Sequence, residues 1–514
     1  MVEASFIAVL VVAGIGLALS ILIERLMVPR STLARPWAAW VLHGGLWLVF
    51  YALMTLILGR PWFSAAIVLA LILMVVLVNN AKFNSLREPF VFQDYEYFTD
   101  TMRYPRLYIP FLGWWKFLGA AAGFVLAISI GLWGESVPDQ RFILSGQAGG
   151  ILLLLMLSIS LLLLGDYQRL AVTFDPQQDV VKLGLLASFW RYAQAERKFP
   201  KTPATFEYTT LPERQPNELP HLVAVQSESF FDPRSLYAGI QPDILAQFDR
   251  LGADALLRGK LKVPAWGANT VRTEFAFLSG INEQTLGVHR FNPYRALAAG
   301  WEIASIASFL KRMGYYTICI HPYPASFYRR ARVYPRLGFD EFLDIRLFTD
   351  TMRFGPYTGD AAVAEQASAL LATAKKPLFI FIITMENHGP LHLEQVSPAD
   401  IGQLYLTPPP AGCDDLTIYL RHLRNADSMV AQLRHTLENC DRAASLCWYG
   451  DHVPIMPTVY DIFGAPEGEV DYVCWSNQHK PAIPSDYHNL RIETLANKWL
   501  TAIFPELNWR NTNI

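Results

Sequence analysis

Long uncharged apolar segments dominate the first third of the chain. Five of them meet or approach the length of about 20 helical residues that a bilayer core requires. They are segments 4–23, 36–59, 61–81, 117–134 and 142–165. Trp37, Trp62 and Trp133 lie near segment ends, as is typical of residues at the membrane interface. The pattern predicts five membrane-spanning helices within residues 1–165. It disfavours both a cleaved signal peptide and the core helices of a soluble protein.

Residues 166–220 have the mixed composition of a connector. Segment 183–201 has an amphipathic pattern, which predicts a helix that either lies on the membrane surface or packs as a connector helix. Prolines then recur at short intervals, which is typical of a linker; they are Pro200, Pro203, Pro212, Pro216 and Pro220.

From residue 221 onward, short apolar runs alternate with longer amphipathic ones. The short runs predict strands at 222–226, 316–320, 378–384 and 446–449. The longer runs predict helices at 242–257, 302–313, 361–375 and 415–439. Strands that alternate with helices indicate an α/β domain over residues 221–514, in which helices cover both faces of a mostly parallel sheet.

Composition agrees with an apolar anchor joined to a more ordinary domain. Of the 514 residues, 52% are hydrophobic and only 17% are charged, against about 25% charged in a typical soluble protein. These values exclude a disordered chain, a disulfide-rich small domain and a highly charged nucleic-acid-binding protein. The five cysteines form no C-x-x-C pair. Cys440 and Cys447 are close enough in sequence for a disulfide, but free buried thiols are an equal alternative.

Polar residues follow four of the predicted strands. In parallel sheets, ligands bind beyond the carboxyl ends of the strands, so these residues are expected at one edge. A glutamate, an aspartate and several histidines at one edge predict a metal site with acid/base groups. Each residue taken singly could equally cap a turn or form a salt bridge. The residues are Glu228, His321, His388, Asp451 and His452, and Glu386 and Asn387 precede His388.

A candidate nucleophile, Thr270, lies in the segment 266–275. Gly267 and Ala268 leave room for a close approach, and Thr270 opens a predicted helix. A helix N-terminus stabilises negative charge, and metal coordination would lower the pKa of the hydroxyl. Arg272 could hold a phosphate. The alternative is that Thr270 only caps the helix, with Glu274 nearby.

Together these motifs resemble the lipoteichoic acid synthase family, which includes phosphoglycerol transferases, within the alkaline phosphatase superfamily. The resemblance covers most of the chain and implies a sulfatase-like α/β domain. It rests on Ser-Glu-Ser-Phe at 227–230, Asn-Thr-Val-Arg-Thr-Glu-Phe at 269–275, the stretch 321–330, Leu-Gly-Phe-Asp-Glu-Phe at 337–342, Asn387-His388 and Tyr-Gly-Asp-His at 449–452.

The resemblance implies a role for each matching residue. By analogy with the family, the metal would be Mn2+; Zn2+ and Mg2+ are the alternatives. Its ligands would be Glu228, Thr270, Asp451 and His452. Tyr328 and Arg330 would bind the glycerol and phosphate of the substrate, and His388 or His321 would move the proton. The implied reaction transfers glycerol phosphate from phosphatidylglycerol to a glycan or polymer acceptor through a phosphorylated Thr270.

Departures from the family pattern define the competing hypotheses. Tyr328 stands where a Trp is frequent and Tyr323 where a polar residue is expected, which bears on polymer synthesis more than on the reaction type. A true sulfatase needs Cys or Ser in a C/S-x-P-x-R pattern, which the segment beginning at Thr270 lacks. The alternatives are a phosphoethanolamine transferase of the same superfamily and a non-catalytic membrane protein that binds lipid or glycan.

Membrane sidedness receives two opposite predictions. The loops after the first and third segments carry most of the basic residues of the apolar third, including Arg25, Arg35 and Lys82. With five spans, the positive-inside rule places the C-terminal domain in the cytoplasm. The resemblance implies instead a bacterial cytoplasmic (inner) membrane protein whose catalytic domain faces the periplasm or cell exterior. We adopt that orientation, since basic loops can also contact anionic lipid headgroups.

Overall fold

The computed structural model describes residues 2–105, 114–135, 147–168, 170–200, 206, 218–478 and 487–507. The chain divides into two compact units, Met1–Lys198 and Phe199–Ile514. Each unit has its own hydrophobic clusters, so each is described separately.

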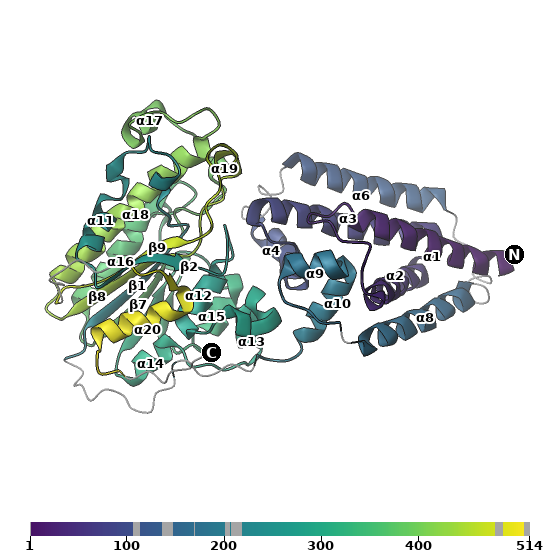
Figure 1. Ribbon diagram of the computed structural model, residues 1–514, viewed down its shortest axis with the longest axis horizontal. Helices are drawn as coiled ribbons and strands as arrows, with labels where there is room; N and C mark the ends of the chain where they lie inside the picture. Colours follow the sequence, from purple (N-terminus) through teal and green to yellow (C-terminus); the bar gives the residue numbers. More distant parts are fainter. Residues whose placement is uncertain are drawn as a thin grey trace. The chain divides into compact units, whose positions relative to one another are not determined.

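The first unit is built from long apolar helices (Figure 1). Its helices are α1 Val2–Glu24, α2 Trp37–Leu58, α3 Pro61–Leu86, α4 Glu96–Arg103, α6 Trp114–Gly134 and α8 Ala148–Tyr167. Four stretches within the described residues are long and apolar enough to cross a membrane, Phe6–Glu24, Trp37–Leu58, Pro61–Leu86 and Ala148–Tyr167. The predicted segment 117–134 lies within α6, and residues 142–146 of the last predicted segment lie outside the described residues. Four helices long and apolar enough to span a membrane are therefore present within the described residues, and the predicted total of five spans stays a prediction.

Polar groups inside this helical unit find partners, as a bilayer environment requires. The indole nitrogen of Trp47 donates to the Ala13 carbonyl at 2.9 Å, and the Tyr51 hydroxyl donates to the Val9 carbonyl at 3.1 Å. Large apolar side chains such as Ile57 and Leu163 point outward and are exposed. Such outward apolar side chains fit a helix surface in contact with lipid.

The connector folds as two short helices, α9 Pro176–Leu183 and α10 Leu185–Ala195. The predicted helix over 183–201 is present in a shorter form as α10, which ends at Ala195 and is separated from α9 by Gly184 with φ 83°. A Cβ at Gly184 would lie 2.0 Å from Nη1 of Arg35, which pairs with Glu24 at 2.6 Å. Ala187 packs in a cluster with residues of α2, which matches the packed alternative. The prolines at 203, 212 and 216 lie outside the described residues.

The second unit is an α/β domain with an eight-stranded sheet in the order β10-β2-β9-β8-β1-β7-β3-β4. The strands are β1 His221–Ser227, β2 Leu257–Lys262, β3 Tyr316–Ile320, β4 Glu341–Leu343, β7 Leu378–Ile383, β8 Ala444–Gly450, β9 Val470–Ser476 and β10 Leu490–Arg491, with a separate pair, β5 Arg353–Phe354 and β6 Tyr357–Thr358. All neighbouring strands in the large sheet run parallel except β9, which runs antiparallel to β2 and β8. The predicted mostly parallel sheet is confirmed.

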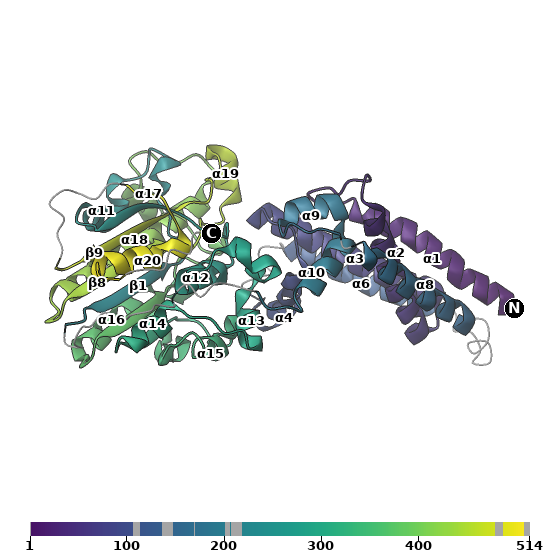
Figure 2. The same cartoon turned by 60° about the horizontal axis from the view of Figure 1, so that its bottom comes forward.

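Helices cover both faces of this sheet (Figures 1 and 2). The helices are α11 Ala246–Ala253, α12 Thr270–Ser279, α13 Pro293–Ala299, α14 Ile306–Arg312, α15 Arg330–Val333, α16 Asp360–Thr373, α17 Pro398–Leu404, α18 Asp414–Glu438, α19 Pro457–Phe463 and α20 Ile492–Ile503. Successive residues of β1 alternate between the two clusters. Leu222 and Ala224 pack towards α12, α14 and α20, whereas Val223 and Val225 pack towards α11, α16 and α18. The alternation follows from the two-residue period of a strand.

Two sequence predictions about this unit need correction, and the cysteine question is answered. The predicted helix 242–257 ends early, since Leu257 begins β2, and the predicted helix 302–313 begins only at Ile306. All five cysteines are free. Cys447 lies opposite Cys474 in the β8–β9 register, with their sulfur atoms 3.6 Å apart, rather than beside Cys440.

Candidate metal centre and active site

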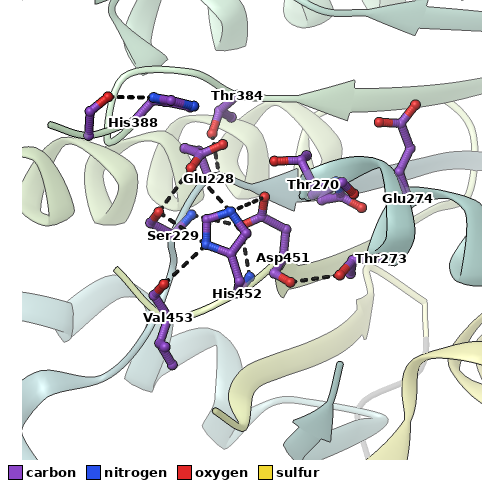
Figure 3. A network of polar contacts seen from close by, with 12 residues as sticks. Glu228, Ser229, Thr270, Thr273, Glu274, Thr384, His388, Asp451, His452 and Val453 are labelled. Carbon is purple, nitrogen blue, oxygen red and sulfur yellow. Dashed lines mark hydrogen bonds and ion pairs between the residues drawn. The ribbon is translucent and has the colours of Figure 1, made fainter. Parts of the chain in front are cut away.

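The register of the two central strands brings the predicted metal ligands together. Ser227 at the end of β1 pairs with Gly450 at the end of β8, so Glu228 and Asp451 emerge side by side. Glu228, Asp451 and His452 are buried, and each offers one ligand atom within 4.8 Å of the others (Figure 3). Asp451 and His452 are adjacent in sequence, whereas Glu228 lies 223 positions before Asp451. The parallel pairing of β1 with β8 brings them together.

Hydrogen bonds orient each ligand. The Ser229 hydroxyl donates to Glu228 Oε1 at 2.9 Å, and the Ser229 amide donates to Asp451 Oδ1 at 2.8 Å. His452 Nδ1 lies 3.1 Å from the Val453 carbonyl. If Nδ1 carries the proton for that bond, the lone pair of Nε2 is left for a metal. His452 Nε2 lies 3.3 Å from Asp451 Oδ2 and 3.6 Å from Glu228 Oε1.

The donor set fits a divalent cation. Within the described residues, the buried Asp451 Oδ2 accepts no hydrogen bond. Burial and the neighbouring Asp451 carboxylate raise the pKa of Glu228 to about 8. Two carboxylates and a histidine held this close are unfavourable without a positive charge among them. These residues therefore suit Zn2+, Mn2+ or a similar ion.

Thr270 is the first residue of α12, and the sequence alternative that it caps the helix is wrong. The position before the helix belongs to Asn269, which has the left-handed φ of 66°. One turn into the helix, the Thr273 hydroxyl donates to the Asp451 carbonyl at 2.7 Å. This bond ties the start of α12 to the metal residues, and Figure 3 shows Thr270 on the same side of the cluster as Asp451.

The two predicted acid/base histidines lie at neighbouring strand ends. His321 follows β3, and its Nδ1 lies 3.1 Å from the Ile383 carbonyl. His388 follows β7, and its Nδ1 lies 2.6 Å from the Gly389 carbonyl. Burial lowers the pKa of both imidazoles, and Arg330 lowers that of His321 further. Both rings are therefore held neutral near pH 7, as a proton acceptor requires.

Arg330 is fixed by a buried ion pair that sequence reasoning missed. Its Nη2 lies 2.7 Å from Glu274 Oε2, and both side chains are almost fully buried. Tyr294 and Tyr334 also donate to Glu274 Oε1, at 2.6 and 2.5 Å. Within the described residues, Nη1 of Arg330 makes no hydrogen bond. That nitrogen is the donor that Arg330 can offer to a bound anion.

Tyr328 lies beside Arg330, whereas Arg272 lies against Phe291. Tyr328 has φ 52°, and its ring lies 5.1 Å from the guanidinium of Arg330, so the two predicted substrate-binding residues are neighbours. Arg272 is buried against Phe291, and its Nε donates to the Phe291 carbonyl at 3.3 Å. Two residues along a helix lie about 200° apart around its axis, so Arg272 and Thr270 occupy different faces of α12. Its phosphate-binding role stays a prediction.

Several residues that support the metal ligands and Arg330 have only weak sequence signals. Ser229 stands beside Glu228, and Thr384 ends the run after β7 and accepts a hydrogen bond from the Glu228 amide at 2.9 Å. Glu274 occurs four residues after Thr270, and its position in the sequence suggests only a charge near the helix end. His422 and Glu386 form a separate buried contact at 3.0 Å that no short motif indicates.

Comparison with known proteins identifies the family of the second unit. The family model described as Sulfatase matches residues 220–502. The capsular polysaccharide biosynthesis protein RkpI of Rhizobium meliloti is 29% identical over 442 residues, covering 80% of this chain and 77% of that protein. A putative cyclic beta-1,2-glucan modification protein of the same organism is 27% identical over 48% of this chain and 38% of its own length.

One solved structure is similar over nearly the whole chain. The integral membrane lipooligosaccharide phosphoethanolamine transferase A (EptA) from Neisseria meningitidis covers 94% of this chain and 95% of its own, with a TM-score of 0.55 and 13% sequence identity. The similarity concerns the fold, a set of membrane helices followed by a sulfatase-like domain. It agrees with the fold class predicted from the sequence.

Proposed function

Because the chain belongs to the Sulfatase family, we propose that it is a membrane-bound phosphoglycerol transferase. It would move glycerol phosphate from phosphatidylglycerol to a glycan or polymer acceptor. The observation that carries the proposal is the buried group of Glu228, Asp451 and His452 beside the first turn of α12, where Thr270 lies. This arrangement supplies a hydroxyl nucleophile in place of the formylglycine that sulfatases derive from Cys or Ser.

A divalent metal held by Glu228, Thr270, Asp451 and His452 would lower the pKa of the threonine hydroxyl and offset phosphoryl charge. The remaining chemistry belongs to the side chains. The N-terminus of α12 favours negative charge at Thr270, and the unpaired Nη1 of Arg330 is available for a phosphoryl oxygen.

In the first half-reaction, the deprotonated Thr270 oxygen attacks the phosphorus of the lipid. A new phosphorus–oxygen bond forms to Thr270, and the bond to the diacylglycerol oxygen breaks. His388 or His321 takes the proton that Thr270 gives up and passes it to that oxygen, which leaves as diacylglycerol. The enzyme then carries glycerol phosphate as a diester on Thr270.

In the second half-reaction, the same histidine removes the proton from an acceptor hydroxyl. The acceptor oxygen forms a bond to phosphorus, the bond to Thr270 breaks, and the histidine passes its proton to the Thr270 oxygen, which restores the starting state. His388 suits this role because, if Nδ1 carries the proton shared with the Gly389 carbonyl, Nε2 is the basic nitrogen.

The donor and acceptor are inferred from two observations. The apolar helices fit a reaction whose lipid donor and diacylglycerol product both stay in the bilayer. The similar proteins of Rhizobium meliloti are named for capsular polysaccharide biosynthesis and for cyclic glucan modification, so a surface or periplasmic glycan is the acceptor class we favour. The matching motifs favour glycerol over ethanolamine as the headgroup and Mn2+ as the metal.

The test uses purified full-length protein with phosphatidylglycerol labelled in its acyl chains, so that released diacylglycerol carries the label. Wild type should release diacylglycerol, and Thr270→Ala should lower the rate about 1,000-fold or more, as expected for loss of a covalent nucleophile. Mass spectrometry of a wild-type digest should detect a glycerol phosphate group on the peptide that contains Thr270. Thr285→Ala, an exposed threonine that bonds only its own turn, serves as the matched control.

Other outcomes separate the competing functions. Release of diacylglycerol from phosphatidylethanolamine but not phosphatidylglycerol would assign the ethanolamine reaction. Release by Thr270→Ala at the wild-type rate would refute the covalent mechanism. Elemental analysis that finds no metal in active-site-intact protein would favour the non-catalytic binding protein.

A further inference from the structure

A second group of buried and half-buried polar side chains lies outside the proposed metal ligands. It gathers where the segment after β7 passes between the N-terminus of α16 and the middle of α18. Its centre is His422, which is completely buried. The other members are Asp360, Glu386, Glu394, Arg421 and Asn425. No step of the proposed reaction uses them.

His422 contacts a carboxylate with each of its ring nitrogens. Nδ1 lies 3.0 Å from Glu386 Oε1, and Nε2 lies 2.8 Å from Glu394 Oε1. A neutral imidazole has a single N–H, whereas two carboxylate partners need two donors, so this geometry requires the protonated ring. The ring of Phe354 packs edge-on against it, with centroids 5.3 Å apart, and helps to exclude water.

The two carboxylates belong to the two ends of one loop. Glu386 also accepts hydrogen bonds from the Asp360 amide and the Asn425 side chain, both at 2.6 Å. Glu394 also accepts one from Arg421 Nη2 at 2.7 Å. His422, which belongs to α18, therefore links the two ends of the loop 386–394 to each other and to that helix. The loop that it closes contains His388.

The residues just before Glu386 join this loop to the metal residues. Thr384 accepts a hydrogen bond from the Glu228 amide at 2.9 Å, and the His388 amide donates to the Met385 carbonyl at 3.1 Å. A short, tied stretch thus connects a metal ligand, the candidate acid/base histidine and the His422 contact. A shift of Glu386 or Glu394 would move His388 relative to Glu228.

We propose that His422 is a positioning residue, whose charged ring clamps Glu386 and Glu394 and so fixes His388 in its working place. The proposal rests on the proposed function, because His388 acts on protons only if that reaction occurs. Within the described residues, the His422 ring nitrogens bond Glu386 and Glu394 and not the metal ligands or the predicted substrate-binding side chains.

The clamp should depend on pH. Burial alone would lower the pKa of His422, but the hydrogen bonds to Glu386 and Glu394 outweigh it and raise the pKa to about 9. The same contacts, with Arg421, keep the pKa of Glu394 below its usual value. Burial and the Glu386 charge hold the pKa of Asp360 well above its usual value. A raised histidine pKa means that the clamp is complete below about pH 6.5 and is lost as the pH rises through about 9.

The experiment compares wild type, His422→Gln and His435→Gln as full-length protein in detergent. His435 is an exposed histidine of the same helix and serves as the matched control. Diacylglycerol release from phosphatidylglycerol is measured from pH 6 to 10, together with metal content and amide hydrogen exchange over residues 385–394. His422→Gln should bind as much metal as wild type, with kcat lowered about tenfold and KM changed less than about twofold. Its pH profile should lack the decline near pH 9, and exchange in the loop should be faster.

A second variant keeps the result interpretable if His422→Gln folds poorly. His422→Gln combined with Glu394→Gln leaves an amide pair in place of the ion pair, and should recover folding and part of kcat without recovering the decline near pH 9. Wild-type kcat, or a wild-type decline near pH 9, in either folded variant would overturn the clamp. Unchanged loop exchange would overturn it too. If wild type releases no diacylglycerol while loop exchange still rises in His422→Gln, the clamp stands and the proposed reaction falls.

Discussion

Two residues beside the reactive groups adopt a backbone conformation that is rare outside glycine. Ser229 follows Glu228 with φ 52°, and Asn269 precedes Thr270 with φ 66°. Such conformations cost about 1–3 kcal/mol each and persist where the surroundings fix them, commonly at functional sites. Both residues turn the chain sharply after an ordered strand or before a helix, which is how Glu228 and Thr270 reach the same edge.

Residue types predicted which side chains meet at the candidate metal site better than they predicted the residues that support them. Glu, Asp, His and Thr at strand and helix ends suffice to suggest a metal and a nucleophile, since few other roles need those groups there. The partner of Arg330 could not be read in the same way. Glu274 lies 56 residues earlier in the chain, and the two charges meet because α13 packs against both α12 and α15.

Removing the partner of Arg330 should strongly destabilise the catalytic unit. Glu274→Gln keeps the shape of the side chain but leaves a fully buried guanidinium without a counter-charge, at a cost of about 3–5 kcal/mol. Urea unfolding followed by tryptophan fluorescence measures the free energy of unfolding. Asp350→Asn, which removes an exposed ion pair with Arg353, should cost less than about 1 kcal/mol. Equal costs for the two variants would contradict the buried-pair explanation.

At the scale of elements, sequence periodicity found the central strands and missed the outer ones. The apolar runs of β1, β3, β7 and β8 stand between turn-forming residues, and all four were predicted. β9 is equally buried, but Asp471 and Ser476 interrupt its apolar run. β2 follows α11 after only a few residues, without a proline or glycine between Ala253 and Leu257, so its sequence extends a helical pattern.

Gly450 is the last residue of β8 and directly precedes the proposed metal ligands Asp451 and His452. A Cβ there would lie 2.1 Å from the Phe230 carbonyl oxygen, which belongs to the backbone. Gly450→Ala should therefore push the end of β8 away from the chain after β1. We expect a loss of about 1–3 kcal/mol in stability and a lower metal content by elemental analysis, because Asp451 moves with the strand.

A matched control for that substitution lies in α17. Gly402→Ala introduces a methyl group into a helix where nothing lies within 4 Å. Its effect should be neutral or stabilising by up to about 1 kcal/mol, with unchanged metal content. Normal metal content in Gly450→Ala would show that the β1–β8 ends do not need this close approach.

At the scale of the whole chain, the sequence predicted an apolar helical part and an α/β part, and both are present. Their composition differs so strongly that no alignment was needed to separate them. The number of spans was harder, because length and hydropathy alone identify four helices and leave the α6 region short of the criterion. Sidedness was harder still, because loop charge and family resemblance point in opposite directions.

Reporter fusions at Ile514 decide the sidedness. We expect a fused alkaline phosphatase, active only after export, to be active, and a fused green fluorescent protein, fluorescent only in the cytoplasm, to stay dark. The same pair fused before Met1 should give the reverse pattern if five helices span the membrane. A fluorescent C-terminal fusion would support the positive-inside rule and would place the catalytic domain away from the outer-leaflet lipid.

The pairing of β1 with β8 also has a consequence for biogenesis. Glu228 follows the first strand of the domain to be synthesised, whereas Asp451 and His452 follow a strand that comes more than 200 residues later. While most of the domain is being synthesised, a growing chain therefore holds only Glu228 and Thr270 of the proposed ligands, and it cannot assemble the site until the segment beyond β8 has emerged. The complete ligand set is therefore available only late in synthesis, and a chain truncated before that point carries the proposed nucleophile, Thr270, without Asp451 and His452.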